Sequence, residues 1–435
     1  CQSGFCMRPV LHRRTFGLGL TALLAAPATG YATVIPDLMD RPPPELEELK
    51  WYPPLRQAIQ ALINANGQYS EHYNASSPPY VVMDWNNMAI VGDVQQTLFL
   101  FMLEHFCFLM PAQKFRKLIH VHASSHPLPA PFTNMAGQPV AFPDLVADIV
   151  EDYSALAARY GHMPHPIARE ALQDDPAMLA FRARMAFCHQ AVAALHGPDA
   201  AQQWMIRLVA EQTQTDVIAL SRAANEWCLG ASIAAQKWVC PSTRPGKAGP
   251  VQVNVTQMLR LTPEMGNLLQ ILQEHGIDPI ICSSALEDLV ALFATSAEYG
   301  YNLRHEHVFG ARLVERKGVM EPVEVPHYPF PAGVGKTELI RLHYEQKRKQ
   351  PPLMIFAGED STANLLQSFP DTPLCCLINR QQSEDMQVFL RAAAQPPPTA
   401  VPRRLYLQGR DENTGEWRPH ASSLLLGSST PTLPT

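Results

Sequence analysis

Asp84 directly follows an apolar run, residues 79–83, and precedes a polar turn that begins at Trp85. A rigid buried strand that delivers a carboxylate onto a turn is a common setting for nucleophilic catalysis. The turn exposes the side chain, and nearby loop amides can bind an anion. Taken alone, an aspartate at a strand end is more often a plain turn former. Three further segments favour the catalytic interpretation.

Each of these segments brings polar side chains to the end of a short apolar run or to the start of a helix. The segment 278–284 ends in Ser283 and Ser284, the segment 333–337 carries Lys336, and the segment 353–361 carries Glu359 and Asp360. Phosphoryl transfer needs an in-line nucleophile and cations that neutralise the phosphoryl oxygens. Mg²⁺ prefers oxygen ligands. The four segments together therefore contain the side chains that a phosphoryl-transfer site requires.

The order of these groups, an aspartate, a hydroxyl, a lysine and an acidic pair, resembles the haloacid dehalogenase superfamily. Longer stretches resemble the secreted bacterial phosphatases of that superfamily that are related to phosphorylcholine phosphatase, whose first motif reads DWDNT. The similar stretches are 64–115, 261–302, 356–380 and 405–419. Together they span most of the chain from about residue 45 to 425.

The resemblance implies an α/β fold, with a Rossmann-like core built on a parallel sheet and a large helical cap inserted after the first core strand. It implies that Asp84 attacks phosphorus and that Ser283 and Lys336 hold the phosphoryl oxygens. It also implies a Mg²⁺ cofactor, and the residues expected to hold it are Asp84, Asn86 through its main-chain carbonyl, Glu359 and Asp360.

Three positions depart from the pattern of the family. The first motif is D-x-D-x-T in such phosphatases, but Asn86 replaces its second aspartate and Met88 replaces its threonine. Glu359 stands where the fourth motif has aspartate. An amide cannot act as general acid or base, and the loss of such a group typically slows a reaction by ~10²–10⁴-fold. Since Mg²⁺ tolerates poor octahedral geometry badly, the longer Glu359 side chain also disturbs the expected metal site.

Three functions from different classes follow. The first is a Mg²⁺-dependent phosphomonoesterase with an aspartyl-phosphate intermediate and weakened turnover, which acts on a small, phosphocholine-like phosphate ester. The second is a catalytically impaired relative that binds a phosphorylated or quaternary-ammonium ligand. The third is a structural or interaction protein with a drifting site. The retained Ser283 and Lys336 favour the first two.

Aromatic residues provide a candidate for ligand binding. Trp85 lies beside the proposed nucleophile, and Tyr153, Trp204 and Trp227 lie in the expected cap. Together they could form an aromatic box for a quaternary ammonium group. Tryptophan and tyrosine at helical spacing are more often core residues. Asp93 could orient the catalytic loop or could simply cap the helix that follows it.

The positions of the motifs, together with the resemblance, imply the domain organisation. Residues 33–98 and 262–425 form the core, residues 99–261 form the cap, and residues 426–435 form a disordered tail. Cap segments such as 142–161, 175–197 and the segment up to Gly230 have apolar residues at a spacing of three to four, which predicts helices. The core segments alternate helix and strand, as a parallel sheet requires.

The first 32 residues resemble a twin-arginine export signal, with Met7 as the true start and residues 1–6 upstream of it. Arg13 and Arg14 precede an apolar run that is too short to span a bilayer. We therefore expect a periplasmic protein without stable membrane insertion after the signal is removed. The net charge of −6 over 435 residues, without a basic cluster, argues against nucleic acid as a partner.

Seven cysteines follow the expected signal, so at least one is free. Cys228 and Cys240 flank a short segment and could pair in an oxidising compartment. The others lie mostly in apolar runs, which is typical of small buried side chains.

Overall fold

The computed structural model describes residues 42–121, 128–162, 165–380, 385–396 and 402–434. The predicted export signal lies outside these residues. From residue 43 onward the chain forms one compact unit, which contains the predicted cap and the predicted core except for residues 33–42. In the described ranges no helix combines the length and the apolar character needed to cross a membrane.

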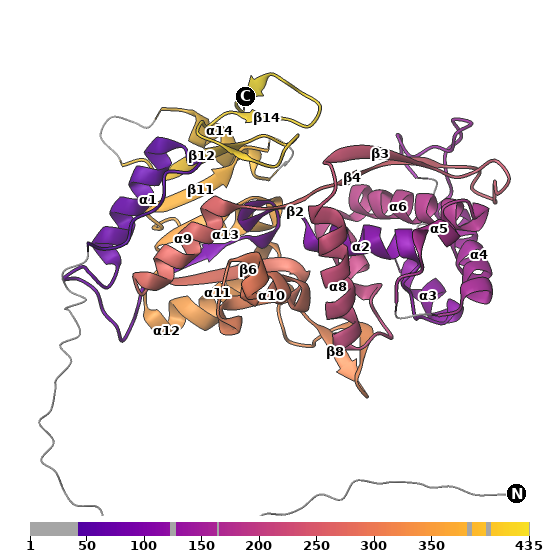
Figure 1. Cartoon of the computed structure of the whole chain (residues 1–435), viewed down its shortest axis with the longest axis horizontal. Coiled ribbons are helices and arrows are strands. Elements are labelled where there is room, and N and C mark those ends of the chain that lie inside the picture. The colour runs from indigo at the N-terminus through magenta and orange to yellow at the C-terminus, as the bar shows by residue number, and fades with distance from the viewer. Residues whose placement is uncertain (1–41, 122–127, 163–164, 381–384, 397–401, 435) are drawn as a thin grey trace, which may run out of the picture. The chain divides into compact units, whose positions relative to one another are not determined.

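A seven-stranded sheet forms the centre of the core, in the order β13-β12-β11-β10-β1-β6-β7 (Figure 1). All neighbouring strands in it run parallel except β12 and β13, which are antiparallel. The strands are β1 (Tyr80–Met83), β6 (Asp278–Leu286), β7 (Val308–Ala311), β10 (Met354–Ala357), β11 (Leu374–Ile378), β12 (Leu405–Arg410) and β13 (Trp417–Arg418). Because β1 is covered on both faces, all four of its residues are buried and its sequence is a continuous apolar run.

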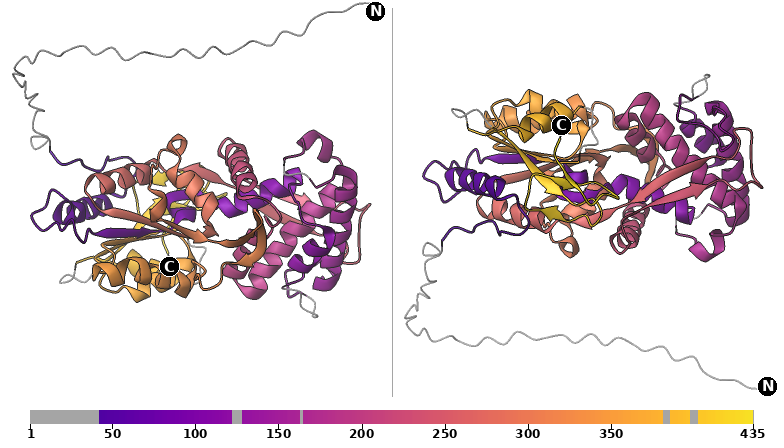
Figure 2. Two further views of the ribbon diagram at one scale, coloured as in Figure 1. Left: turned by 90° about the horizontal axis from the view of Figure 1, so that it is seen from below. Right: turned by 90° about the horizontal axis from the view of Figure 1, so that it is seen from above.

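Helices cover both faces of this sheet (Figure 2). Alternate side chains of β1 join different apolar clusters, since Val81 packs with one cluster and Val82 with the other. The first cluster includes side chains of α1 (Pro53–Asn66), α9 (Pro263–Glu274) and α10 (Glu287–Thr295). The second includes side chains of α11 (Gly333–Ile340), α13 (Ala363–Ser368) and α14 (Gln387–Ala394). The predicted α/β core with a parallel sheet is confirmed.

Short helical segments complete the core connections. They are η2 (Trp85–Ala89), η3 (Ala297–Tyr299), η4 (His305–His307), η5 (Arg341–Glu345), α12 (Gln346–Arg348) and η6 (Asp360–Thr362). Two of them, η2 and η6, follow β1 and β10 at the same edge of the sheet. They carry the residues that the sequence predicts to do chemistry.

The helical insertion after the first core strand is also confirmed. It contains α2 (Val94–His105), α3 (Ala112–Ile119), α4 (Phe142–Tyr160), α5 (Arg169–Leu172), α6 (Pro176–His196), α7 (Pro198–Arg207) and α8 (Gln214–Leu229). The helical pattern did not predict the antiparallel hairpin of β3 (Ala234–Val239) and β4 (Gln252–Gln257) that follows them. The expected cap boundary at residue 99 falls inside α2, so the insertion begins earlier, after β2.

A buried charge network ties the hairpin loop to the cap helices. Asp152 on α4 accepts hydrogen bonds from Arg184 on α6 and, at 2.8 Å, from Arg244 Nε in the hairpin loop. Arg184 and Asp152 are almost completely buried. Removal of one partner would leave the other as an uncompensated buried charge. The network therefore fixes the cap as one packed body.

The two connections between core and cap pair with each other. Strand β2 (Ile90–Gly92) leads into the cap, and β5 (Leu259–Leu261) returns from it antiparallel to β2. Gly92 has a φ of +93°, and a Cβ atom there would lie 2.0 Å from the main-chain oxygen of Met258. Only glycine fits this close approach.

A separate set of non-covalent contacts also joins the cap to the core. The hairpin of β8 (Leu313–Arg316) and β9 (Val319–Glu324) extends from the core, and Met320 exchanges main-chain hydrogen bonds of 2.9 and 2.8 Å with Glu211 and Gln212 just after α7. Arg207 at the end of α7 also pairs with Glu324 at 2.8 Å. The cap is thus held at two separate places.

Two predictions about the ends and the cysteines need correction. The predicted disordered tail contains β15 (Pro431–Thr432), which pairs with β14 (Ser423–Leu424), and Asn379 Nδ2 donates to the Thr432 carbonyl at 2.9 Å. All seven cysteines of the described residues are buried and free, so Cys228 and Cys240 form no disulfide. The Cys240 thiol instead donates to the Arg244 carbonyl at 3.3 Å.

We predict that Gly92→Ala lowers the free energy of unfolding by at least ~2 kcal/mol more than Gly137→Ala does. Both glycines have positive φ, but Gly137 has open space around its Cβ position. The difference between the variants therefore isolates the contact with Met258. Urea unfolding of both variants measures it, and equal destabilisation would contradict the assigned role of this contact.

Candidate active site

Asp84 and Lys336 form a buried ion pair at the carboxyl edge of the sheet. The Asp84 amide donates to the Phe356 carbonyl at 2.9 Å, so the residue continues the pairing of β1 with β10. Lys336 Nζ pairs with Asp84 Oδ1, and the two residues are only 3% and 1% exposed. Two residues that are 252 positions apart in the chain thus meet in the interior.

The other Asp84 oxygen is also occupied. Oδ2 accepts hydrogen bonds from the Gly358 amide at 3.0 Å and from the Thr362 hydroxyl. Lys336 Nζ in turn donates to Ser361 Oγ at 3.2 Å and to Thr362 Oγ1 at 3.0 Å. An ammonium group has three N–H donors, so these partners and Asp84 use all of them. The carboxylate is therefore held in one orientation.

Close backbone packing brings Lys336 to this position. Lys336 lies in the first turn of α11, and a Cβ atom on the preceding Gly335 would lie 2.0 Å from the Phe330 carbonyl oxygen. Burial by itself lowers the pKa of Lys336, but the negative charge of Asp84 outweighs it, so this pKa is raised. The lysine is therefore fully charged at neutral pH.

Glu359 lies next to this pair in a crowded acidic environment. Its Oε1 accepts a hydrogen bond of 2.8 Å from Asn87 Nδ2. Burial, together with the negative charges of Asp93 and Asp84, raises the pKa of Glu359 to about 7. Excess negative charge at this edge of the sheet makes it a suitable place for a cation.

The turn that carries Asn87 is held by a residue at the end of β12. Asn87 has a φ of +57°, and its carbonyl accepts a hydrogen bond of 3.2 Å from Arg410 Nη1. Arg410 is completely buried and pairs with Glu412 at 2.8 Å. A Cβ atom on Gly358 would lie 2.6 Å from the Asn87 carbonyl oxygen, so the loops that follow β1 and β10 touch through their backbones.

Asn86, the residue in place of the expected general acid and base, points toward the start of the cap. Its Oδ1 accepts a hydrogen bond of 3.2 Å from the Val94 amide at the first turn of α2. Its Nδ2 is buried and, within the described residues, has no hydrogen-bond partner. Among the described residues, both N–H donors of this side chain are thus free in the interior, and the amide cannot exchange a proton.

The two serines of β6 have different surroundings. Adjacent residues of a strand point to opposite faces, and Ser284 borders a cavity at the Asp84 edge of the sheet. The predicted phosphate ligand, Ser283, accepts a hydrogen bond of 3.2 Å from the Ala285 amide and is almost completely buried. Its role stays a prediction, and Ser284 becomes a second candidate.

Two further predicted site residues have structural contacts. Asp360 Oδ1 accepts a hydrogen bond of 3.0 Å from the Met386 amide, while the residue borders the cavity beside Glu359. Trp85 has no exposed surface, and its ring lies against Tyr301 and Phe293 with centroid distances of 5.1 and 6.1 Å. These contacts favour the core alternative for Trp85 over a place in an aromatic box.

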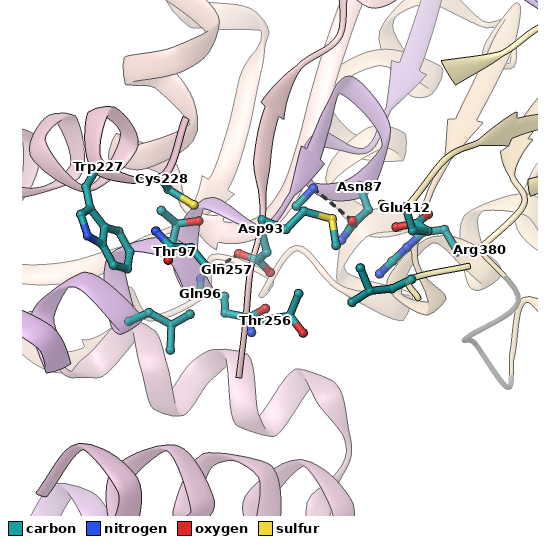
Figure 3. Close-up of a pocket in the computed structure, with 14 residues that line it drawn as sticks. Asn87, Asp93, Gln96, Thr97, Trp227, Cys228, Thr256, Gln257, Arg380 and Glu412 are labelled. Atoms are coloured by element: carbon teal, nitrogen blue, oxygen red, sulfur yellow. Dashed lines mark hydrogen bonds between the residues drawn. The ribbon is translucent and has the colours of Figure 1, made fainter. Parts of the chain in front are cut away.

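The aromatic cap residues do not gather near Asp84. Trp204 is buried against Phe99, and Tyr153 stacks on Phe115 inside the cap. Trp227 borders a second cavity of about 230 Å³ that is shown in Figure 3. Asp93 and Arg380 line both this cavity and the one beside Glu359.

The cavity beside Glu359 has a volume of about 240 Å³. Glu359 and Ser361 border it from the core, and Gln202 borders it from cap helix α7. Because Ser361 is bonded to Lys336, the cavity reaches the immediate surroundings of the Asp84 carboxylate. In the described part of the chain, no group of three or more histidine, cysteine or acidic side chains is arranged to hold a metal ion.

Comparison with known proteins gives a distant structural similarity. No protein-family model and no curated protein matches the chain. The chain is similar to a conserved functionally unknown protein from Anaerococcus prevotii DSM 20548, with a TM-score of 0.79 and 26% identity over 87% of this chain and 98% of that one. This likeness extends over both the core and the cap but assigns no activity.

Two hydrolase-like structures match more weakly. One is a phosphoserine phosphohydrolase-like protein from Francisella tularensis subsp. tularensis SCHU S4, with a TM-score of 0.29 and 13% identity over 71% of this chain and 91% of that one. The other is a haloacid dehalogenase family hydrolase from Salmonella enterica subsp. enterica serovar Typhi, with a TM-score of 0.30 and 10% identity over 69% and 62%. Neither carries an argument about activity.

The sequence did not single out several of these contacts. Thr362 and Ser361 lie just after the acidic pair and could have been suspected as hydroxyl donors. The Gly358 amide donor could have been suspected as well, because Gly358 directly follows the predicted strand. No sequence pattern singles out Gln202, because its position at the cavity depends on how α7 packs against the core.

We predict that Lys336→Met lowers the free energy of unfolding by ~3 kcal/mol or more, because it leaves Asp84 as an uncompensated buried charge. Adding Asp84→Asn should recover part of this loss. Lys114→Met, which removes an exposed ion pair with Glu211, is the control and should cost less than ~1 kcal/mol. Urea unfolding checks all three, and a Lys336→Met cost no larger than the control would contradict the buried pair.

We also predict that Glu359→Gln changes the pH dependence of stability. Glu359 keeps its proton up to about pH 7 in the folded protein, whereas an unfolded chain releases it near pH ~4.3. The folded state therefore binds more protons in this window, and the Glu359 contribution to stability falls as the pH rises through it. The glutamine keeps the acceptor for Asn87 and has no charge.

Urea unfolding at pH 5 to 8 with EDTA gives the test. As the pH rises from 5 to 8, the free energy of unfolding of the variant should increase relative to that of the parent protein by on the order of 1–3 kcal/mol. The increase should be complete at about pH 7. A difference that stays constant with pH would show that Glu359 is ionised throughout.

Proposed function

We propose that this protein is a phosphoric monoester hydrolase in which Asp84 is the nucleophile and turnover is weak. The observation that carries the proposal is the Asp84–Lys336 pair, buried at the carboxyl edge of a parallel sheet and bordered by hydroxyls and a cavity. A fixed carboxylate with an adjacent lysine is suited to attack a phosphoryl group while the lysine neutralises its oxygens.

Lys336 binds the phosphoryl group by exchanging partners. Its bonds to Ser361 and Thr362 are contacts to neutral hydroxyls, whereas its bond to Asp84 is charge-assisted. A phosphoryl oxygen replaces the two hydroxyls with a stronger, charged acceptor. Release of Thr362 from Lys336 also lets its hydroxyl reorient and free Asp84 Oδ2 for attack.

The donor set fits Mg²⁺ in its chemistry. Asp84 and Glu359 offer carboxylate oxygens as ligands. Burial, and after it the negative charges of Asp93 and Asp84, raises the pKa of Glu359 to about 7, and a nearby cation would offset this repulsion. Mg²⁺ is commonly held by one or two carboxylates together with waters and substrate phosphate, so a group of three acidic side chains is not required. Asp84, Glu359 and the Asn86 carbonyl would hold it, with Asp360 beside them. When bound, it would neutralise phosphoryl charge.

Asn86 limits turnover. Its free Nδ2–H can donate a hydrogen bond to the leaving oxygen but cannot transfer a proton to it or activate water. An aryl phosphate has a good leaving group and can phosphorylate Asp84 without this help. An alkyl ester has a poorer leaving group, so its hydrolysis should be slowed most.

A specific observation also supports the second candidate, a binding protein without turnover. Both Asp84 oxygens and all three Lys336 donors have partners within the protein. A carboxylate that keeps these bonds would not attack. The two candidates therefore differ in whether Asp84 becomes phosphorylated.

We predict a pre-steady-state burst of about one nitrophenol per active site from p-nitrophenyl phosphate with Mg²⁺, followed by slow steady turnover. The burst should disappear in Asp84→Asn. Asn86→Asp should leave the burst and raise the slow phase by ~10-fold or more, because it restores a general base. Rapid-quench measurement of nitrophenol release provides the test.

Two outcomes separate the alternatives. Fast linear turnover of both aryl and alkyl esters would show that the site is not impaired. Absence of both burst and turnover, with retained binding of inorganic phosphate, would favour the binding protein.

A further inference from the structure

The cavity beside the ion pair has a wall that belongs to the cap. Helix α7 lies against β6 and α2, which places its first turns over the carboxyl edge of the sheet. Pro198, Asp199 and Gln202 of this helix border the cavity, opposite Glu359 and Ser361 of the core. A leaving group attached to a phosphoryl group at Asp84 would extend into this space.

Gln202 is the unusual residue of this wall. It is 7% exposed, and its Nε2 has no hydrogen-bond partner among the described residues. Burial of an unpaired amide donor is costly and normally has a reason. The Gln202 side chain lies near enough to Asp93 to lower the pKa of that carboxyl, which burial raises overall. The Gln202 amide donor and the Asp93 carboxylate acceptor thus lie next to each other at one cavity wall.

The support behind Gln202 is rigid. Its helix neighbours Trp204 and Ile206 are buried, and Arg207 pairs with Glu324 of the core hairpin at 2.8 Å. The main-chain bonds between Met320 and the segment after α7 hold the same end. A side chain on such a support can recognise a ligand group at a fixed position.

The side chains that line the cavity indicate which kind of chemical group of the leaving group would bind there. Among the described residues that line it, Pro198 is the one apolar residue, and none of them is aromatic. A quaternary ammonium group prefers aromatic faces and has no N–H or O–H to donate. A hydroxyl group can accept from Gln202 Nε2 and donate to Asp93 at the same time.

We propose that Gln202, together with Asp93, recognises a hydroxyl of the leaving group, so that the substrates are small hydroxylated alkyl phosphates of the polyol phosphate class. This inference rests on the proposed function, since it places the phosphoryl group at Asp84. It assigns specificity to a cap residue that touches the leaving group and not the phosphorus.

Binding by the full protein in the Asp84→Asn background tests the inference without consuming the ester. Isothermal titration compares glycerol 3-phosphate, propyl phosphate, choline phosphate and inorganic phosphate. Glycerol 3-phosphate should bind ~10-fold or more tightly than propyl phosphate, which has the same carbon chain without hydroxyls.

Gln202→Leu should weaken glycerol 3-phosphate binding by ~10-fold and leave propyl phosphate and inorganic phosphate unchanged. Gln203→Leu is the matched control, because Gln203 is the next residue of α7 and does not border this cavity. It should leave all four affinities unchanged.

The possible failures can be told apart. If the phosphate compounds bind but glycerol 3-phosphate has no advantage over propyl or choline phosphate, the role of Gln202 is overturned and the proposed function is not. An equal loss for every compound in Gln202→Leu also overturns the role. If none of the compounds binds, the proposed function fails, and this inference fails with it.

Discussion

The burial of one ion pair constrains the whole active edge of this protein. Asp84 and Lys336 are both almost inaccessible to solvent, so each needs the other and a full set of hydrogen bonds to offset the loss of hydration. Those bonds come from the Gly358 amide and the hydroxyls of Ser361 and Thr362. They fix the distance between the loops after β1 and β10.

The glycines of the core follow from the same constraint. Gly335 and Gly358 lie where a Cβ atom would collide with neighbouring backbone, and both adjoin groups of the pair. The lysine and the carboxylate can meet only because these backbones approach so closely. The glycine next to Lys336 therefore has a packing role.

The replacements in the motifs alter the charge balance of this edge more than its shape. Asn86 removes one negative charge and retains an N–H donor, while Glu359 keeps an acidic group whose pKa is about 7 because of burial and its acidic neighbours. Under the proposed function, the site retains groups that would hold a phosphoryl oxygen and lacks the group that would move a proton. This combination is expected to favour formation of a covalent intermediate over its hydrolysis.

The sequence by itself determined the parts of the protein that local pattern controls. Fully apolar runs predicted the buried strands, and side chains that follow such runs, such as Asp84 and Glu359, were placed at one edge because parallel strands end together. Helical spacing predicted most of the cap but not the β3–β4 hairpin, whose contacts come from the distant Asp152 and Arg184.

Only the tertiary structure decided the rest. The choice between Ser283 and Ser284 depends on which face of β6 meets the cavity, since neighbouring strand residues point in opposite directions. Trp85 was a candidate ligand residue until its packing against Tyr301 and Phe293 placed it in the core. Gln202 gained a possible role because α7 lies over the sheet edge. Such contacts join residues that are far apart in the chain, and no local pattern of residue types encodes them.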